Sequence, residues 1–117
     1  MDKPIPLETI LGEFDDDYEA WVLQDSASGL YVVVPDDRYP GRRPIRFFMK
    51  SDDAATLLEE IVKVNDKLAE RDIHPVQVNL KRAMRGIASD RNPNNADSFV
   101  LHSPNETMAW EWQKRAE

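Results

Sequence analysis

The sequence contains no cysteine, and this absence removes several kinds of chemistry at once. A disulfide framework, a thiolate nucleophile and a thiolate metal site are all excluded. Glycine is scarce, at four residues, and no glycine-rich loop that could hold a phosphate group is present. The two histidines, His74 and His102, lie outside any metal-binding spacing such as HExxH. We therefore expect no catalytic residues, no metal site and no cofactor.

Long apolar runs are also missing. No stretch approaches the roughly 20 residues needed to span a bilayer, and the N-terminus lacks the basic and apolar regions of a signal peptide. We therefore expect no membrane partner and a cytoplasmic location. With 117 residues, of which 41% are hydrophobic, the chain can bury one core but is too short for two. The expected organisation is a single domain over residues 1–117.

The charge that is present is unevenly placed. The chain carries a net charge of −7, with eight acidic residues against one Lys in residues 1–34. Residues 35–50 instead carry five basic residues against two acidic ones. An acidic excess disfavours binding to a nucleic-acid backbone, where Lys and Arg supply most of the affinity. We predict no nucleic-acid partner, and the basic island at 35–50 requires a local explanation.

The N-terminal half favours strands. Residues 21–24 and 30–34 are rich in β-branched and aromatic residues and flank a turn that contains Gly29, which predicts a β-hairpin. Residues 31–34 are apolar without alternation, so we expect the second of these strands to be central and covered on both faces. Residues 45–49 predict a third strand.

A long helix is predicted over about residues 52–69. Ser51 is placed to act as its N-cap, and Asp52 and Asp53 carry carboxylates that favour the positive end of the helix dipole. Apolar residues recur at helical spacing and predict one buried face. These residues are Ala54, Leu57, Leu58, Ile61, Val64 and Leu68.

The remaining elements complete an α+β fold. Residues 74–80 alternate as in a half-buried strand, 81–87 predict a short second helix, and 98–102 predict a strand. Residues 107–113 alternate as in a strand but contain helix-favouring residues; the turn before them favours a strand and hence a C-terminal hairpin. The predicted architecture is a mainly antiparallel sheet packed against the long helix.

The densest carboxylate run is a candidate partner-binding loop. Asp15, Asp16 and Asp17 are consecutive, with Tyr18 beside them. Hard cations prefer oxygen ligands, but the run lacks the alternating spacing and the glycine of the helix–loop–helix calcium motif. We interpret residues 13–19 as a solvated acidic loop, whose functional alternative is contact with a basic partner.

The basic island offers a second candidate surface. Its candidate contact residues are Arg38, Tyr39, Arg42 and Arg43. Arg can bind phosphate or carboxylate groups through two hydrogen bonds, so an anion or an acidic partner could bind there. The alternative, which we favour, is that these side chains pair with the acidic N-terminal segment and with Asp36 and Asp37 of the chain itself. The two loops 13–19 and 36–43 are therefore the expected contact regions.

The C-terminal tryptophans allow two interpretations. Trp110 and Trp112, with Met108, could form an exposed aromatic stripe of the kind that marks a binding surface. They could also complete the core of a small domain, which we favour. A related hypothesis is that this terminal strand pairs with its counterpart in a homodimer.

One family resemblance covers residues 20–87. The stretches 21–33, 47–54 and 76–80 give a hairpin around a polar turn with glycine, an aromatic pair before a helix, and an alternating strand before a short helix. This pattern is similar to one half of the Tic-twenty-two family of chloroplast and cyanobacterial import proteins. The resemblance implies a non-enzymatic, protein-binding role.

These observations lead to two functional hypotheses. The first is a non-catalytic protein-interaction domain, more specifically an acidic inhibitor or immunity-type protein that binds a basic partner protein. The second is a small-ligand or enzymatic domain that binds an anionic substrate through the Arg-rich loop 38–50, with His74 or His102 as a general base. The second hypothesis requires a histidine and at least two of the arginines to converge.

Overall fold

The computed structural model describes residues 3–89 and 94–113, and the account that follows concerns those residues. Its elements along the chain are α1 (Leu7–Leu11), β1 (Glu19–Asp25), β2 (Pro44–Phe48), α2 (Ser51–Val64), the 3-10 helix η1 (Asp66–Glu70), β3 (Ile73–Asn79), α3 (Leu80–Ile87), β4 (Ser98–His102) and β5 (Thr107–Glu111). The Cα radius of gyration is 13.7 Å, close to the roughly 13 Å expected for a single domain of this length.

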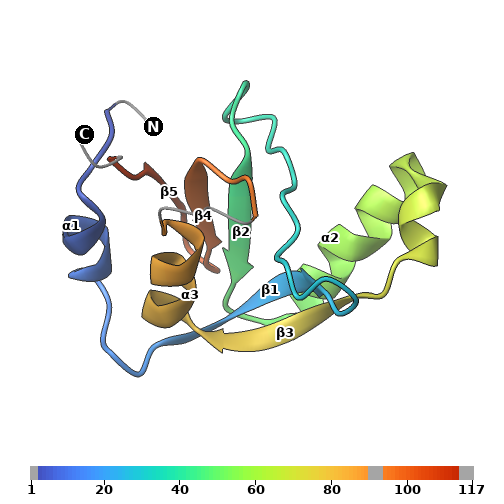
Figure 1. Ribbon diagram of the computed structural model, residues 1–117, viewed down its shortest axis with the longest axis horizontal. Helices are drawn as coiled ribbons and strands as arrows, with labels where there is room; N and C mark the ends of the chain where they lie inside the picture. The colour runs from blue at the N-terminus through green and yellow to red at the C-terminus, as the bar shows by residue number, and fades with distance from the viewer. Residues whose placement is uncertain (1–2, 90–93, 114–117) are drawn as a thin grey trace.

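The strands form one mixed sheet in the order β3-β1-β2-β4-β5 (Figure 1). Strand β1 is antiparallel to both of its neighbours, β4 is antiparallel to β5, and β2 is parallel to β4. A parallel pair needs a crossover connection, and the chain passes through α2, β3 and α3 between β2 and β4. The predicted α+β fold with a mainly antiparallel sheet is confirmed.

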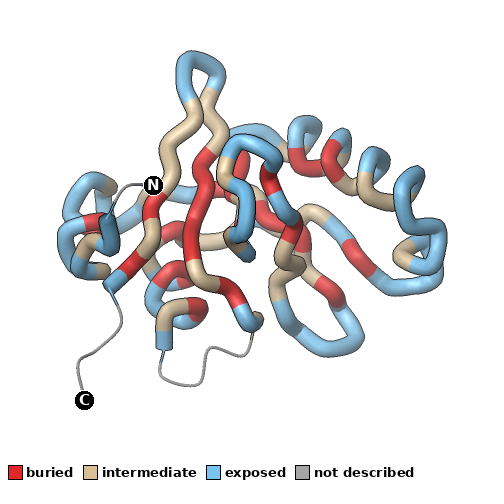
Figure 2. Tube along the Cα trace, turned by 90° about the horizontal axis from the view of Figure 1, so that it is seen from above, coloured by how far each residue is buried: buried red, intermediate tan, exposed pale blue. Residues whose placement is uncertain are grey.

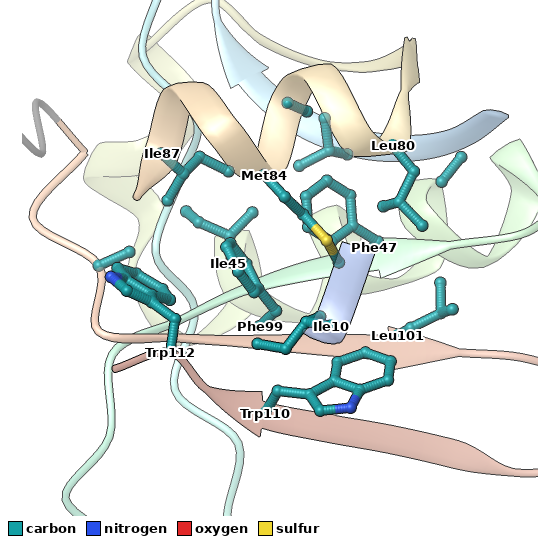
Figure 3. Close-up of a cluster of buried hydrophobic side chains, with 14 of the residues drawn as sticks. Ile10, Ile45, Phe47, Leu80, Met84, Ile87, Phe99, Leu101, Trp110 and Trp112 are labelled. Atoms are coloured by element: carbon teal, nitrogen blue, oxygen red, sulfur yellow. The ribbon is translucent and has the colours of Figure 1, made fainter. Parts of the chain in front are cut away.

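The two faces of the sheet are covered by different helices. Helices α1 and α3 gather on one side of the view in Figure 1, and α2 lies on the other. Against α3 pack the inward side chains of β2 and β4, including Phe47 and Phe99, whose ring centroids are 6.1 Å apart. Figure 3 shows the Met84 side chain extending from α3 toward these strands. A smaller cluster on the opposite face packs Ala54 and Leu57 of α2 against the sheet.

Helix α2 is shorter than the sequence predicts. Its N-cap position is Lys50 rather than Ser51, and no side chain caps it. It ends at Val64 because Asn65 adopts an extended backbone, and the Asn65 side chain accepts a hydrogen bond from the Lys67 amide at the start of η1. Asn competes with helical hydrogen bonding in this way. The helix predicted over 52–69 is thus an α-helix followed by a separate 3-10 turn.

The predicted hairpin of residues 21–24 and 30–34 is also corrected. The first strand is present as part of β1, but residues 30–34 form no regular strand and make only isolated bridges, from Tyr31 to Gln24 and from Val33 to Ile45. Only Val34 within 31–34 is buried. An apolar run can thus lie between two strands without extending the regular ladder of either.

The C-terminal hairpin is confirmed, with residues 107–111 in the strand conformation. The N-terminal segment pairs with its outer edge, because the Ile5 amide donates to the Glu111 carbonyl at 2.8 Å and the Gln113 amide donates to the Ile5 carbonyl at 2.7 Å. The predicted short second helix is present as α3, where the Asn79 side chain accepts a hydrogen bond from the Arg82 amide. Among the described residues, no helix is both long and apolar enough to cross a membrane.

Candidate functional site

One concave surface is a groove between residues 30–38 and the α2–η1 segment. The first wall exists because β1 and β2 are joined at one residue pair, Trp21 and Phe48, and diverge beyond it. Residues 30–34 lie between the two strands where they diverge. The Val32 amide donates to the Leu23 carbonyl of β1 at 3.0 Å, and the Val34 amide donates to the Pro44 carbonyl of β2 at 3.4 Å. Backbone hydrogen bonds therefore hold this wall to β1 on one side and to β2 on the other.

The second wall is the apolar stripe of α2. Ala54 and Leu57 are buried, but burial decreases along the helix until Val64 is 89% exposed. Figure 2 shows the same gradient, with the buried positions of α2 confined to the half nearest the sheet. Ile61 and Leu68 are only partly buried. The face that the sequence predicts to be buried is therefore only partly buried at Ile61 and is exposed at Val64.

The groove between these walls has a volume of about 1030 Å³. Its apolar lining comes from both walls and includes two of the exposed large hydrophobic residues, Leu30 and Val64. Apolar concave surfaces with a few polar groups are the usual form of binding sites. The sequence contained one signal of this site: an apolar stripe that continues to Leu68, beyond what the sheet covers.

A polar cluster adjoins the groove, and three of its four members line it. It consists of Asp36, Arg38, Arg46 and His102. Arg38 donates from Nε and Nη2 to the two carboxylate oxygens of Asp36, at 3.0 and 2.6 Å. Arg46 lies 3.8 Å from the same carboxylate. The Asp36 side chain is 5% exposed, and the hydrogen bonds from Arg38 lower its pKa to about 2.

His102 is the centre of this cluster. Its ring stacks on Phe48 with centroids 4.7 Å apart, and its Nε2 accepts a hydrogen bond from Arg46 Nε at 3.0 Å. Its Nδ1 faces Arg38 Nη2 at 3.4 Å and Thr107 Oγ1 at 3.5 Å. Burial, followed by the charges of Arg46 and Arg38, lowers the pKa of His102 to about 4. The neutral ring therefore ties residues 36–38 to β2 and β4.

The convergence that the second functional hypothesis requires is thus observed for His102 with Arg38 and Arg46. Both ring nitrogens have neighbours, and the arginine donors are directed to Asp36, to His102, to Thr107 and to the Pro35 carbonyl. A general base needs a nitrogen free to accept the substrate proton. The arrangement holds a loop in place rather than presenting free donors or a free base.

The other predicted basic residues are engaged elsewhere. Arg42 forms an ion pair with Glu111 of β5 at 2.8 Å, and Arg43 Nε donates to the Asn95 carbonyl at 2.9 Å. The ring of Tyr39 lies 5.9 Å from the Arg38 guanidinium carbon. The arginines of the island therefore bond within the chain, to Asp36 as expected and also to Glu111 and the Asn95 carbonyl. Among the described residues, none of their ion pairs involves the acidic N-terminal segment or Asp37, so that part of the expectation is wrong.

The acidic loop lies apart from the groove. Asp15, Asp16 and Asp17 are all exposed, and Asp16 pairs with Lys81 of α3 at 2.8 Å. Tyr18 is half-buried and packs beside Phe14 against the core. Figure 1 places the α1–β1 connection at the lower left and the connection into β2 at the top, so the two predicted contact loops lie on opposite sides of the molecule.

The predicted aromatic residues at the C-terminus are core residues. Trp110 is 7% exposed and Trp112 is 5% exposed. Trp112 stacks on Phe99 with centroids 4.6 Å apart, and Trp110 meets Phe14 edge to face. Figure 3 shows both indoles directed into the cluster beneath α3. Their side chains have little surface left for a partner.

Residues 3–89 and 94–113 contain no group of three or more His, Asp or Glu side chains that could hold a metal ion. In comparisons with known proteins, no family model and no curated sequence matches this chain.

Proposed function

We propose that this protein is a non-catalytic protein-interaction domain that binds its partner in the groove between residues 30–38 and α2–η1. The observation that carries the proposal is the groove itself, whose apolar lining includes two exposed large hydrophobic residues, Leu30 and Val64. Binding sites are usually concave and lined mainly by apolar residues, with a few polar groups.

The groove is a better candidate than an anion site at the polar cluster. An anion would need guanidinium donors, and those of Arg38 and Arg46 are largely taken by groups of the chain itself. The groove also supports the interaction better than the loop 13–19, because an apolar centre with a polar rim is the usual anatomy of a protein interface.

Site-specific photo-cross-linking tests the proposal. A photoreactive residue is introduced at Val64, and separately at Met49, which is 42% exposed but does not line the groove. We expect a protein adduct from position 64 and none from position 49. The captured protein, once purified, should bind the unmodified chain and lose affinity for Val64→Asp but not for Met49→Asp. Equal affinity for both variants would refute the groove as the binding surface.

A further inference from the structure

The sheet ends in two outer strands, β3 and β5. The N-terminal segment pairs with the outer edge of β5, where the Ile5 backbone bonds to Glu111 and Gln113. No strand of the described part of the chain pairs with the outer edge of β3. Open strand edges carry unpaired N–H and C=O groups and readily pair with a strand of another molecule. We propose that Pro75 keeps the outer edge of β3 from pairing with a second copy of the chain.

The hydrogen bonds between β1 and β3 show which backbone groups of β3 face outward. The Leu80 amide donates to the Tyr18 carbonyl at 2.9 Å, and the Ser26 amide donates to the Asp72 carbonyl at 2.8 Å. Both contacts lie in register with the β1–β3 ladder. Bonded and non-bonded pairs alternate along an antiparallel ladder. The even-numbered residues of β3 therefore bond to β1, and the odd-numbered residues direct their N–H and C=O groups away from it.

Pro75 interrupts the row of outward donors on this edge. Proline has no N–H group, and a ring carbon takes the place of the missing hydrogen. The Ile73 amide is already bonded, to the Arg71 carbonyl at 3.0 Å. Gln77 and Asn79 are therefore the residues of β3 that offer outward N–H groups. Figure 1 shows β3 along the lower rim of the molecule, with no other labelled element beyond it.

Apart from Pro75, β3 has the composition of a strand that pairs readily. It contains no Asp, Glu, Lys or Arg, although these residues make up 32% of the chain. Charged side chains are a common protection of strand edges, and β3 lacks them. Proline is tolerated in an edge strand where its nitrogen faces outward, and it then hinders a further strand from joining. The proline is therefore the protection that the sequence of β3 itself provides.

A second copy is the partner that this edge would otherwise accept. A two-fold, antiparallel contact centred on Gln77 pairs the backbone of each Gln77 with its own counterpart. It places Val76 opposite Val78 of the second copy, and β-branched side chains pack well on a pleated surface. The paired segments carry no charged side chain, so like charges do not meet. Position 75 lies opposite Asn79 of the second copy, where the proline ring obstructs the pairing.

Replacing the proline tests the proposal. Pro75→Val restores the outward N–H group and leaves the β1–β3 ladder intact, because the nitrogen of residue 75 faces away from β1. In sedimentation, we expect this variant to self-associate about tenfold or more tightly than the unmodified chain. Pro104→Val is the matched control, since Pro104 is exposed in the connection between β4 and β5, and it should sediment like the unmodified chain. Circular dichroism of each variant confirms that the fold is retained.

A single cysteine locates the contact. The chain has no cysteine of its own, and Gln77 is exposed. Bonded partners in an antiparallel pair have Cα atoms about 5.5 Å apart, which a disulfide can bridge. In the Pro75→Val background, Gln77→Cys should form a disulfide-linked dimer about tenfold faster than Glu59→Cys, at an exposed position of α2. With Pro75 in place, the two cysteine variants should form linked dimers at similar rates.

The outcomes decide the proposal without reference to the groove, because no residue of β3 lines it. Self-association of Pro75→Val that is lost again in the double variant Pro75→Val/Gln77→Pro supports the proposal. A folded Pro75→Val that sediments like the unmodified chain would overturn it, and so would a dimer that persists in the double variant. Faster linkage at position 77 than at position 59 with Pro75 in place would also overturn it. This last comparison needs no substitution of the proline, so it holds even if Pro75→Val does not fold.

Discussion

Protonation of His102 should destabilise the fold in mildly acidic solution. The folded protein lowers the pKa of this histidine from 6.5 to about 4, whereas the unfolded chain retains the ordinary value. Between these two values the unfolded state binds more protons, so the stabilisation is fully present above about pH 6.5 and is lost as the pH falls toward 4. The groups facing the ring are Arg38, Arg46, Asp36 and, from α2, Asp53.

The size of the effect follows from the shift in pKa. A shift of this size corresponds to about 3 kcal/mol at about 1.4 kcal/mol per pKa unit. The ring is half-buried, and solvent screening reduces this to about 1 to 2 kcal/mol. Between about pH 7.5 and pH 5, where most carboxylates stay ionised, we expect a loss of about 1 kcal/mol. For a domain of this size that loss lowers the Tm by about 4 °C.

Urea unfolding followed by tryptophan fluorescence at both pH values measures this loss. His102→Asn should remove most of the pH dependence, because the variant has no imidazole at that position. His74→Gln is the matched control, since the chain has two histidines and His74 is exposed beside Asp72. The reasoning fails if His102→Asn retains the full pH dependence, or if His74→Gln removes it.

Urea unfolding should also give defined outcomes for five further variants. Phe47→Ala should cost about 3 to 5 kcal/mol, because Phe47 is fully buried and its removal leaves a cavity; Met49→Ala, at an exposed position, should change stability by less than about 0.5 kcal/mol. Gly86→Ala should stabilise α3 by up to about 1 kcal/mol, since a Cβ there meets open space. Gly29→Ala should instead destabilise by about 1 kcal/mol, because Gly29 has a φ of +75°; the same sign for both glycines would contradict this account. Asp36→Asn should cost about 2 kcal/mol by leaving two guanidinium groups without their carboxylate, and an unchanged midpoint would show that the polar cluster does not stabilise the loop.

The elements that were correct from the sequence are those with a local signal. The alternation of residues 74–80 and the apolar spacing of 81–87 identify β3 and α3 without knowledge of their neighbours. The Pro-rich loop before Ile45 and the β-branched and aromatic residues after it mark β2 in the same way. Such signals depend on side-chain periodicity, which a single segment carries by itself.

The predictions that were wrong concern segments whose structure or burial depends on their neighbours in the fold. Residues 30–34 have the composition of a strand, but the divergence of β1 from β2 beyond one pair leaves no regular ladder for them to join. The periodicity of α2 correctly places Val64 on the apolar face. It cannot show that the sheet stops before Val64, so an exposed position was predicted to be buried.

The polar cluster was beyond sequence reasoning for a related reason. His102 and Arg46 are separated by 56 positions and meet only because β2 and β4 are parallel neighbours, with Phe48 opposite His102. No motif spacing encodes that register. The sequence indicates separate roles for Arg38, Asp36 and His102, and nothing in it groups these residues with Arg46.

The single residue pair between β1 and β2 also bears on how the molecule comes apart. With only Trp21 and Phe48 in register, the sheet resembles two cooperative units, β3–β1 and β2–β4–β5, joined by a narrow hinge and a wedge of irregular chain. Local opening should start at this seam, and amides of residues 32 and 34 should exchange with solvent sooner than those within β4. A ligand bound against residues 30–38 would stabilise the contact between the two units. Slower amide exchange at residues 32 and 34 would then report that the groove is occupied, even when the overall structure does not change.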